Sequence, residues 1–284
     1  GTESIILACK AAREAWREKV GQPHGRPEMV LPITAHAAFH KAAHYLGFDK
    51  VLVDVDHTTW RAIPAKVAEA IGPKTALIVG SSPGYAHGVI DPIAELAQLA
   101  VDEDVWLHVD ACVGGFLLPY YRELGKDVPP FDFSLPGVRS LSVDLHKYGY
   151  APKGASIVLY RNKDWRRYQH FACSQWTGYT VINPTVQSTK TGGPIAGAWA
   201  ILNFLGKDGY LDFCRKMIEG MDHLVATIED IDGFELCAQP DFSLLAATST
   251  SFSIFHVIDL MKQRGWYIQP QLSYGPSPHN VHFS

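Results

Sequence analysis

The chain has 284 residues, of which 47% are hydrophobic and 19% charged, so it can bury one large core and a smaller second one. The net charge of -4 gives no electrostatic reason to expect nucleic acid as a partner, and no block of lysine and arginine predicts a membrane-surface patch. The expected partners are small molecules or further copies of the chain.

Five cysteines are scattered without metal-ligand spacing, and their odd number argues against a closed disulfide framework. We therefore expect a reducing compartment, a cytoplasmic location and no metal site. No run of about 18 apolar residues is present to span a bilayer. Residues 1–4 resemble the middle of a motif, so we expect the natural chain to begin earlier, and a membrane anchor in such a segment stays open.

Apolar runs alternate with helix-period segments along most of the chain, which is typical of a sheet covered by helices on both faces. The runs are short and buried in character, as in parallel strands. We therefore predict an α/β large domain with a mostly parallel sheet. The expected elements, in chain order, are a helix over 3–18, a strand-like run over 29–33, a helix over 37–46, a strand over 51–53, a helix over 63–71, a strand over 75–79, a helix over 92–101, and strands over 105–109, 140–143 and 156–160.

The last third of the chain has a different pattern. After Gly192-Gly193-Pro194, helices are predicted over 195–205 and 211–228, followed by weaker strands near 234–237 and 244–253. We predict a large domain over residues 1–205 and a smaller C-terminal α+β domain over residues 206–284.

Two predicted strands bring polar side chains to one rim of the sheet. Asp110 ends one strand, and the strand over 140–143 delivers His146 and Lys147 to the same rim, where ligands of open α/β sheets gather. Pyridoxal phosphate requires an amine for its aldehyde and an anion that keeps its pyridine nitrogen protonated. Lys147 and Asp110 can supply both. An isolated lysine after a strand is more often a surface residue, but the apolar, glycine-flanked turn around Lys147 favours the cofactor.

Two further turns have the chemistry that this cofactor needs. Residues 1–4 precede a helix, whose free amides and dipole favour a phosphate, and Thr2 adds a hydroxyl donor. His146 can reach the same phosphate, and the alternative for this turn is a plain N-cap. His36 precedes another helix, where its ring can stack on a pyridine face. A helix cap or a core histidine is the alternative for His36.

Taken together, these segments resemble the fold-type I enzymes of the group II pyridoxal-phosphate decarboxylase superfamily, and within it the sphingosine-1-phosphate lyases. The resemblance covers nearly the whole chain. The segment after Lys147 is especially lyase-like, because amino-acid decarboxylases generally keep the His-Lys pair without the Tyr-Gly-Tyr that follows. The segments that carry the resemblance are Gly-Thr-Glu-Ser at 1–4, Ala-His-Ala-Ala-Phe at 35–39, His-Gly-Val-Ile-Asp-Pro at 87–92, His-Val-Asp-Ala-Cys at 108–112, Gly-Gly-Phe at 114–116, Pro-Phe-Asp-Phe at 130–133 and His-Lys-Tyr-Gly-Tyr-Ala-Pro-Lys-Gly at 146–154.

The resemblance implies a role for each of the cofactor residues. Lys147 would form the Schiff base with the cofactor, and Asp110 would pair with the pyridine nitrogen. His36 would stack on the ring, while Thr2 and His146 would hold the phosphate.

Tyr85 and Lys153 match active-site positions of the lyases, which implies roles in substrate handling and proton transfer. The alternative for Tyr85 is a tyrosine packed in a glycine turn. One loop departs from the family pattern, because Lys190 stands in Ser-Thr-Lys-Thr-Gly-Gly where the lyases usually have Ser-Arg-Pro-Gly-Gly. Arginine grips a phosphate as a fork and lysine as a point charge, so the loop's role stays open.

The implied activity is retro-aldol cleavage of sphingoid base 1-phosphates to a fatty aldehyde and phosphoethanolamine. A group II L-amino-acid decarboxylase is the alternative, since geometry at the cofactor chooses the bond that breaks. A catalytically silent relative with the same fold is a third hypothesis. The family also implies a homodimer with the cofactor at the subunit interface.

Overall fold

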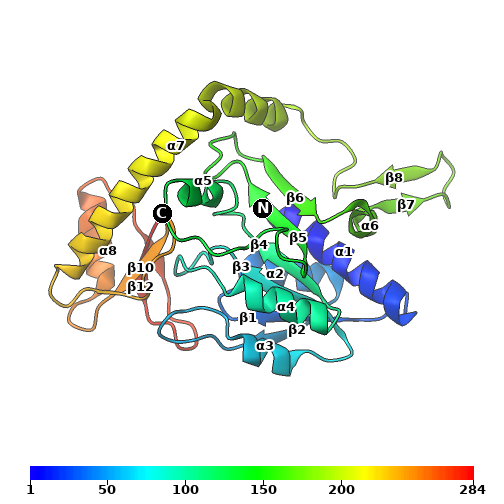
Figure 1. The fold of residues 1–284 in the computed structure, drawn as a ribbon, viewed down its shortest axis with the longest axis horizontal. Coiled ribbons are helices and arrows are strands. Elements are labelled where there is room, and N and C mark those ends of the chain that lie inside the picture. Colours follow the sequence, from blue (N-terminus) through cyan, green and yellow to red (C-terminus); the bar gives the residue numbers. More distant parts are fainter.

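The computed structural model describes residues 1–284, and a six-stranded sheet lies at its centre (Figure 1). The strand order is β2-β1-β3-β4-β5-β6. Neighbouring pairs from β2 to β5 are parallel, and β6 runs antiparallel to β5, which confirms a mostly parallel sheet. The strands are β1 (Glu28–Pro32), β2 (Asp49–Val53), β3 (Thr75–Ser81), β4 (Trp106–Asp110), β5 (Val138–Asp144) and β6 (Ser156–Tyr160).

Helices cover both faces of this sheet, as the sequence pattern predicts. On β3, Leu77 and Val79 pack with α1 and α2, while Ile78 between them packs with α3 and α4 on the other face. This alternation follows from the two-residue period of a strand. The helices are α1 (Thr2–Val20), α2 (Ala37–Leu46), α3 (Pro64–Ala70), α4 (Ile93–Asp102) and the short α5 (Leu118–Glu123).

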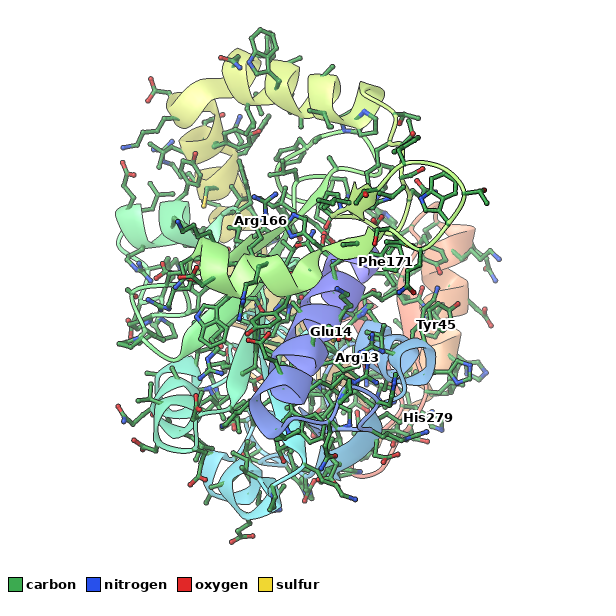
Figure 2. The ribbon with its side chains drawn as sticks, turned by 90° about the vertical axis from the view of Figure 1, so that its right-hand side faces the viewer. Arg13, Glu14, Tyr45, Arg166, Phe171 and His279 are labelled. Atoms are coloured by element: carbon green, nitrogen blue, oxygen red, sulfur yellow. The ribbon has the colours of Figure 1, made fainter.

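Helix α1 lies along the outside of the sheet and packs against α2 (Figure 2). Arg13 joins the two helices, because its Nη1 donates to the Leu46 carbonyl oxygen at 2.7 Å while its Nη2 lies 2.8 Å from Glu14 Oε1. The other side of α1 contacts a short segment after β6, made of α6 (Lys163–Arg166) and the 3-10 turn η1 (Arg167–Gln169). Helix α1 is thereby fixed with its N-terminus at the rim of the sheet.

A hairpin and one long helix lead away from the sheet. The hairpin strands β7 (Phe171–Cys173) and β8 (Val181–Asn183) project beyond α6, and α7 (Gly193–Glu229) crosses the top of the molecule (Figure 1). The sequence predicts two helices here, and the structure joins them with a single non-helical residue, Gly206, at φ 58° and ψ -172°. Glycine adopts a positive φ without strain, so the helix can change direction there.

The C-terminal part of the chain forms a second, antiparallel sheet in the order β11-β12-β10-β9. Its core includes Leu245 and Val281 and packs on Ile228 near the end of α7. The domain boundary between residues 205 and 206 stays a prediction. The elements are β9 (Glu235–Leu236), β10 (Leu245–Thr248), α8 (Ile254–Gln263), β11 (Gln269–Gln271) and β12 (Asn280–Phe283).

Three neighbouring strands end at the same rim. Ser81 of β3 lies opposite Asp110 of β4, and Asp110 lies opposite Ser142 of β5, so Asp144 ends its strand two residues farther on. The register therefore gathers the carboxyl ends of β3, β4 and β5 around one point. Among the helices of the structure, none has the length and apolarity that crossing a membrane requires.

Candidate active site

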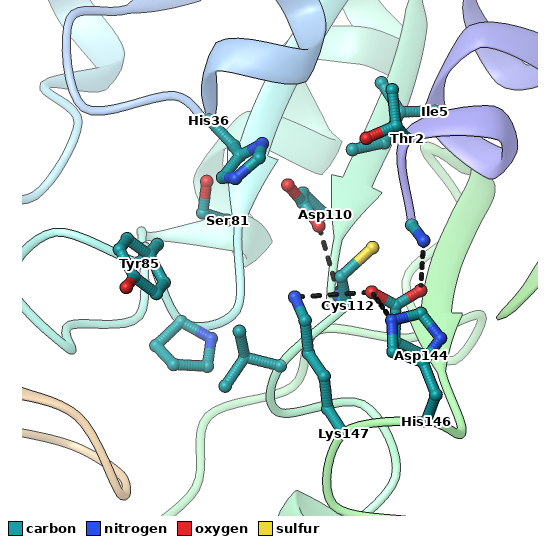
Figure 3. A pocket seen from close by; sticks show the side chains of 13 residues that line it. Thr2, Ile5, His36, Ser81, Tyr85, Asp110, Cys112, Asp144, His146 and Lys147 are labelled. Carbon is teal, nitrogen blue, oxygen red and sulfur yellow. Dashed lines mark hydrogen bonds and ion pairs between the residues drawn. The ribbon is translucent and has the colours of Figure 1, made fainter. Parts of the chain in front are cut away.

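A pocket of about 220 Å³ lies at this rim, between the strand ends and the N-terminus of α1 (Figure 3). Lys153 does not line it, because this lysine is exposed in the turn before β6. Its role in substrate handling stays a prediction. The other residues singled out from the sequence all line the pocket: Thr2, His36, Tyr85, Asp110, His146 and Lys147.

The amine of Lys147 points into the pocket and pairs with Asp144 (Figure 3). Lys147 Nζ lies 3.3 Å from Asp144 Oδ2, and the Asp144 side chain is only 1% exposed. Burial opposes the ionisation of Asp144. Hydrogen bonding to Ser156 and the positive charge of Lys147 favour the ionised form and so act to lower the pKa of Asp144. The pocket therefore places a buried carboxylate against its lysine.

A second buried carboxylate, Asp110, has no cation beside it. Asp110 Oδ1 accepts hydrogen bonds from the Cys112 backbone N–H at 3.1 Å and from Ser142 Oγ at 3.3 Å. No protein group donates to Oδ2, although the residue is only 7% exposed and lines the pocket. A buried carboxylate is stable when it is fully hydrogen-bonded or paired. Oδ2 is therefore free to accept a hydrogen bond from a protonated ring nitrogen of a ligand.

The N-terminus of α1 forms another wall of the pocket. Thr2 is its first residue, and no side chain caps this end of the helix. The Gly1 nitrogen lies 2.9 Å from Asp144 Oδ1, and a Cβ on Gly1 would lie 2.5 Å from Asp144 Oδ2. Glycine at position 1 thus lets the helix end approach the carboxylate. The free amides of this end suit an anionic group, but that group would share them with Asp144.

His146 lies on the other side of Asp144. Its Nε2 is 3.6 Å from Asp144 Oδ2, and its Nδ1 lies 2.8 Å from the carbonyl oxygen of Ala155. The two contacts orient the ring across the pocket wall between Asp144 and Lys147. Asp144 is thus the common neighbour of the α1 terminus, His146 and Lys147.

His36 and Tyr85 face the pocket from the opposite side (Figure 3). His36 does cap α2, because its Nδ1 accepts a hydrogen bond from the Ala38 N–H at 3.1 Å. The cap therefore fixes the ring at the pocket instead of excluding it from a functional role. Tyr85 is 39% exposed and meets His36 edge to face, with ring centroids 6.2 Å apart.

Sequence reasoning missed several residues of the pocket. Asp144 does have a sequence signal, since it ends a strand and precedes Lys147 by three residues. Cys112 follows Asp110, and burial together with the charge of Asp110 raises the pKa of its thiol well above the usual value. Ser81 ends β3 beside Asp110. Neither a lone serine nor a buried thiol has a sequence pattern that separates it from ordinary core residues.

Comparison with known proteins identifies the family. Residues 1–248 match the model of the pyridoxal-dependent decarboxylase conserved domain. The chain belongs to the pyridoxal-dependent decarboxylase family. Membership confirms the predicted cofactor, pyridoxal 5'-phosphate, and the free oxygen of Asp110 fits it. The match also ends within the C-terminal sheet, so it includes the large sheet, the pocket and α7.

Within this pyridoxal-dependent decarboxylase family, the chain is similar to several sphingosine-1-phosphate lyases. It is 44% identical over 268 residues to that of Arabidopsis thaliana, which is 94% of this chain and 49% of the relative. It is 40% identical over 284 residues to sphingosine-1-phosphate lyase 1 of Rattus norvegicus, which is 100% of this chain and 49% of the relative. The chain thus spans about half the length of the curated relatives it matches.

Solved structures agree with this placement. The sphingosine-1-phosphate lyase of Burkholderia pseudomallei superimposes with a TM-score of 0.94 at 41% identity, over 100% of this chain and 63% of that chain. The glutamate decarboxylase of Lactobacillus brevis superimposes with a TM-score of 0.86 at 22% identity, over 99% of this chain and 67% of that one. The second likeness shows the fold alone, which confirms the predicted fold-type I architecture.

Proposed function

We propose that this chain belongs to a pyridoxal-phosphate-dependent lyase that cleaves sphingoid base 1-phosphates to a fatty aldehyde and phosphoethanolamine. The observation that carries the proposal is the pocket, where a lysine and a cation-free buried carboxylate meet in a chain 44% identical to a sphingosine-1-phosphate lyase. The pocket supplies the groups for the cofactor, and the likeness supplies the substrate class.

Each pocket residue has a task that follows from its position. When bound, pyridoxal phosphate supplies an aldehyde that takes up an amine and a ring that accepts the electrons of the broken bond. Lys147 is the amine that would hold the aldehyde, and Asp110 Oδ2 would accept the ring N–H. His36 would lie against the ring. Thr2 and His146 would bind the phosphate at the N-terminus of α1.

Proton transfer requires groups that can hold a proton near the substrate. Lys147 can take or give one whenever its amine is free, and Asp144 Oδ2 at 3.3 Å then keeps that amine in the pocket. Tyr85 has a partly exposed ring at the pocket wall, which suits contact with a substrate. Lys153 would act only if its turn moved, because the residue is exposed outside the pocket lining.

The proposal is tested directly by determining which bond of its substrate the protein breaks. The full-length protein, loaded with pyridoxal phosphate, is incubated with a sphingoid base 1-phosphate and, separately, with glutamate and aromatic amino acids. We expect equal amounts of fatty aldehyde and phosphoethanolamine from the first substrate and no carbon dioxide from the others. Carbon dioxide without aldehyde would establish the decarboxylase alternative. A protein that stays colourless with the cofactor would support the silent relative.

We also propose that the protein is a homodimer, with the hairpin β7–β8 and the start of α7 in the interface. Large apolar side chains there are well exposed: Tyr179 is 77% exposed, Trp199 69% and Phe204 84%. Large apolar side chains this exposed on two successive segments of the chain are a sign of an interaction surface. The hairpin is followed by the loop in which Lys190 Nζ lies 2.5 Å from Glu3 Oε2 of α1, so the interface would adjoin the pocket.

Sedimentation of the full-length protein tests this proposal. We expect a dimer, and we expect Trp199→Lys to shift it toward the monomer while an exposed control on α8, His256→Lys, leaves it unchanged. A wild-type monomer with full activity at high dilution would overturn the proposal.

A further inference from the structure

The C-terminal sheet reaches the pocket through one side chain, His282 of β12. Successive residues of a strand point to opposite faces, and Val281 belongs to the core of the C-terminal sheet. His282 therefore points the other way, toward the large sheet. Its ring centroid lies 4.4 Å from that of Tyr85, with the two ring planes 37° apart. The rings of His282 and Tyr85 are thus packed against each other, with their planes tilted, across the boundary between the two sheets.

His282 is buried on all sides. The residue is 2% exposed, and neither ring nitrogen has a hydrogen-bond partner. Burial lowers the pKa of His282 to about 4, so its ring is neutral at pH 7. A buried polar group without partners destabilises the fold. Because the His282 ring is buried and neutral, it presents a flat, uncharged surface to the Tyr85 ring.

The segment that carries Tyr85 is held by the C-terminal sheet at further points. Gln271 Nε2 donates to the Ala86 carbonyl oxygen at 2.9 Å, and His87 Nε2 lies 3.3 Å from Ser277 Oγ. His87 in turn stacks on Trp60, with centroids 4.3 Å apart and planes 10° apart. Burial, together with nearby His282, lowers the pKa of His87 to about 4, so this ring is also neutral.

Gly88 closes the segment with a tight contact. It has φ +72°, and a Cβ there would lie 1.8 Å from the Leu244 carbonyl oxygen, just before β10. No side chain fits at this position without moving the backbone of the C-terminal sheet. The turn that presents Tyr85 is therefore pressed between the pocket on one side and the C-terminal sheet on the other.

We infer that His282 is a positioning residue, which holds the Tyr85 ring at the pocket by packing behind it. His282 does not line the pocket, so it acts on the substrate only through Tyr85. The inference rests on the proposed function to the extent that Tyr85 contacts the substrate. It makes the C-terminal sheet a structural part of the substrate side of the pocket.

Two apolar replacements of His282 distinguish the role of its ring from the role of its ring nitrogens. His282→Phe keeps a flat ring and removes both nitrogens, whereas His282→Leu removes the ring as well. In the full-length protein loaded with pyridoxal phosphate, 19F NMR of 3-fluorotyrosine at position 85 reports the state of this ring without any substrate. We expect one sharp signal in the wild type and in His282→Phe, and a broadened or divided signal in His282→Leu. The exposed histidine His256 on α8 provides the control, His256→Leu.

Kinetic measurements test whether His282 acts on the substrate through Tyr85. We expect His282→Leu to raise KM for a sphingoid base 1-phosphate about tenfold, with the visible spectrum of the bound cofactor unchanged. In a Tyr85→Ala background the same replacement should have no further effect. Loss of the sharp signal in both His282 variants would show that the nitrogens matter, and retention in both would show that the ring does not. Either result overturns the inference. The expected NMR signals in a protein without lyase activity would instead refute the proposed function alone.

Discussion

Two pockets lie at opposite ends of β3, β4 and β5, and they differ in how their charges are paired. The larger one, about 340 Å³, is at the amino ends and is lined by Trp16, Trp106 and Trp165. Three of its charged groups, Lys19, Asp104 and Arg139, pair with one another. Asp104 lies 2.8 Å from Lys19 Nζ and 2.5 Å from Arg139 Nη2, and the Arg139 guanidinium stacks 4.4 Å from the Trp165 ring.

The smaller pocket at the carboxyl ends has a surplus of anionic groups. Lys147 can satisfy Asp144, but Asp110 keeps one oxygen without a donor. The difference shows that volume is a poor guide to function. A pocket prepared for chemistry holds buried groups that only a ligand completes.

A chain of hydrogen bonds joins the two ends through the middle of the sheet. Trp106 Nε1 donates to Ser140 Oγ at 2.8 Å, and His108 lies between Ser140 Oγ at 2.8 Å and Ser142 Oγ at 3.2 Å. Ser142 Oγ then donates to Asp110 Oδ1. The supports of Asp110 are thus fully buried, which leaves only its pocket oxygen available.

Replacing Asp110 should give the largest difference in turnover between the two pockets. Asp110→Asn keeps the shape but removes the charge opposite the cofactor ring, so we expect turnover to fall roughly 10²- to 10³-fold, as for the loss of one preorganised electrostatic partner. Steady-state assays of the full-length protein measure this loss. The matched change at the other pocket, Asp104→Asn, should leave turnover unchanged. Equal effects of the two replacements would contradict the distinction between the pockets.

Lowering the pH should destabilise the fold through His108, one of the buried groups that support Asp110. Burial lowers the pKa of His108 from 6.5 to about 4. The unfolded chain therefore binds a proton more readily, and the stability that His108 contributes is complete above about pH 6.5 and is lost as the pH falls through about 4. The contribution is about 3 kcal/mol, at 1.36 kcal/mol per pKa unit. Urea unfolding across this pH range measures it, and His108→Gln should flatten the dependence. An unchanged pH profile in that variant would show that other groups carry the effect.

Asp144→Asn removes the partner of Lys147 without removing its hydrogen-bonding shape. We expect the amine to be less well placed and turnover to fall about tenfold, in the range of coupling between contacting residues. Asp54 offers a matched control, because it is an exposed carboxylate with Lys66 Nζ at 3.0 Å. Steady-state assays of Asp144→Asn and Asp54→Asn should differ by the expected factor. Wild-type turnover in Asp144→Asn would leave this carboxylate without a role.

The smallest effect is expected at the amino-end pocket. Arg139→Ala removes a pair with the exposed carboxylate of Asp104 and the contact with Trp165, so the free energy of unfolding should fall by only about 1 kcal/mol. Cofactor affinity and turnover should not change, which urea titration and cofactor absorbance can measure together. A large loss of turnover would mean that the two pockets are coupled through the sheet.

The residues at the rim of the sheet could be predicted because each has a sequence signal in its own neighbourhood. Asp110 and Lys147 follow apolar runs whose period and order determine a parallel sheet, and parallel strands bring their carboxyl ends together. His36 was singled out because it precedes a helix, and it both caps α2 and lines the pocket, while its role at the cofactor ring stays a prediction. Lys153, assigned from the resemblance to the lyases, lies outside the pocket lining, and its role stays a prediction.

Contacts between segments that lie far apart in the chain could not be predicted from the sequence. His282 meets Tyr85 across most of the chain, and no period or motif relates the two. The strand that carries His282, which pairs with β10 and β11, was not predicted either. By contrast, α7 was predicted as two helices, and it does leave helical geometry at Gly206, between the two predicted segments.

The central claim is that Lys147 is the amine that holds pyridoxal phosphate. The full-length protein, incubated with the cofactor, reduced with borohydride and digested, can be mapped by mass spectrometry. The account predicts a pyridoxyl group on the peptide that contains Lys147, and none on any peptide after Lys147→Ala. A pyridoxyl group on another lysine, with Lys147 unmodified, would contradict it.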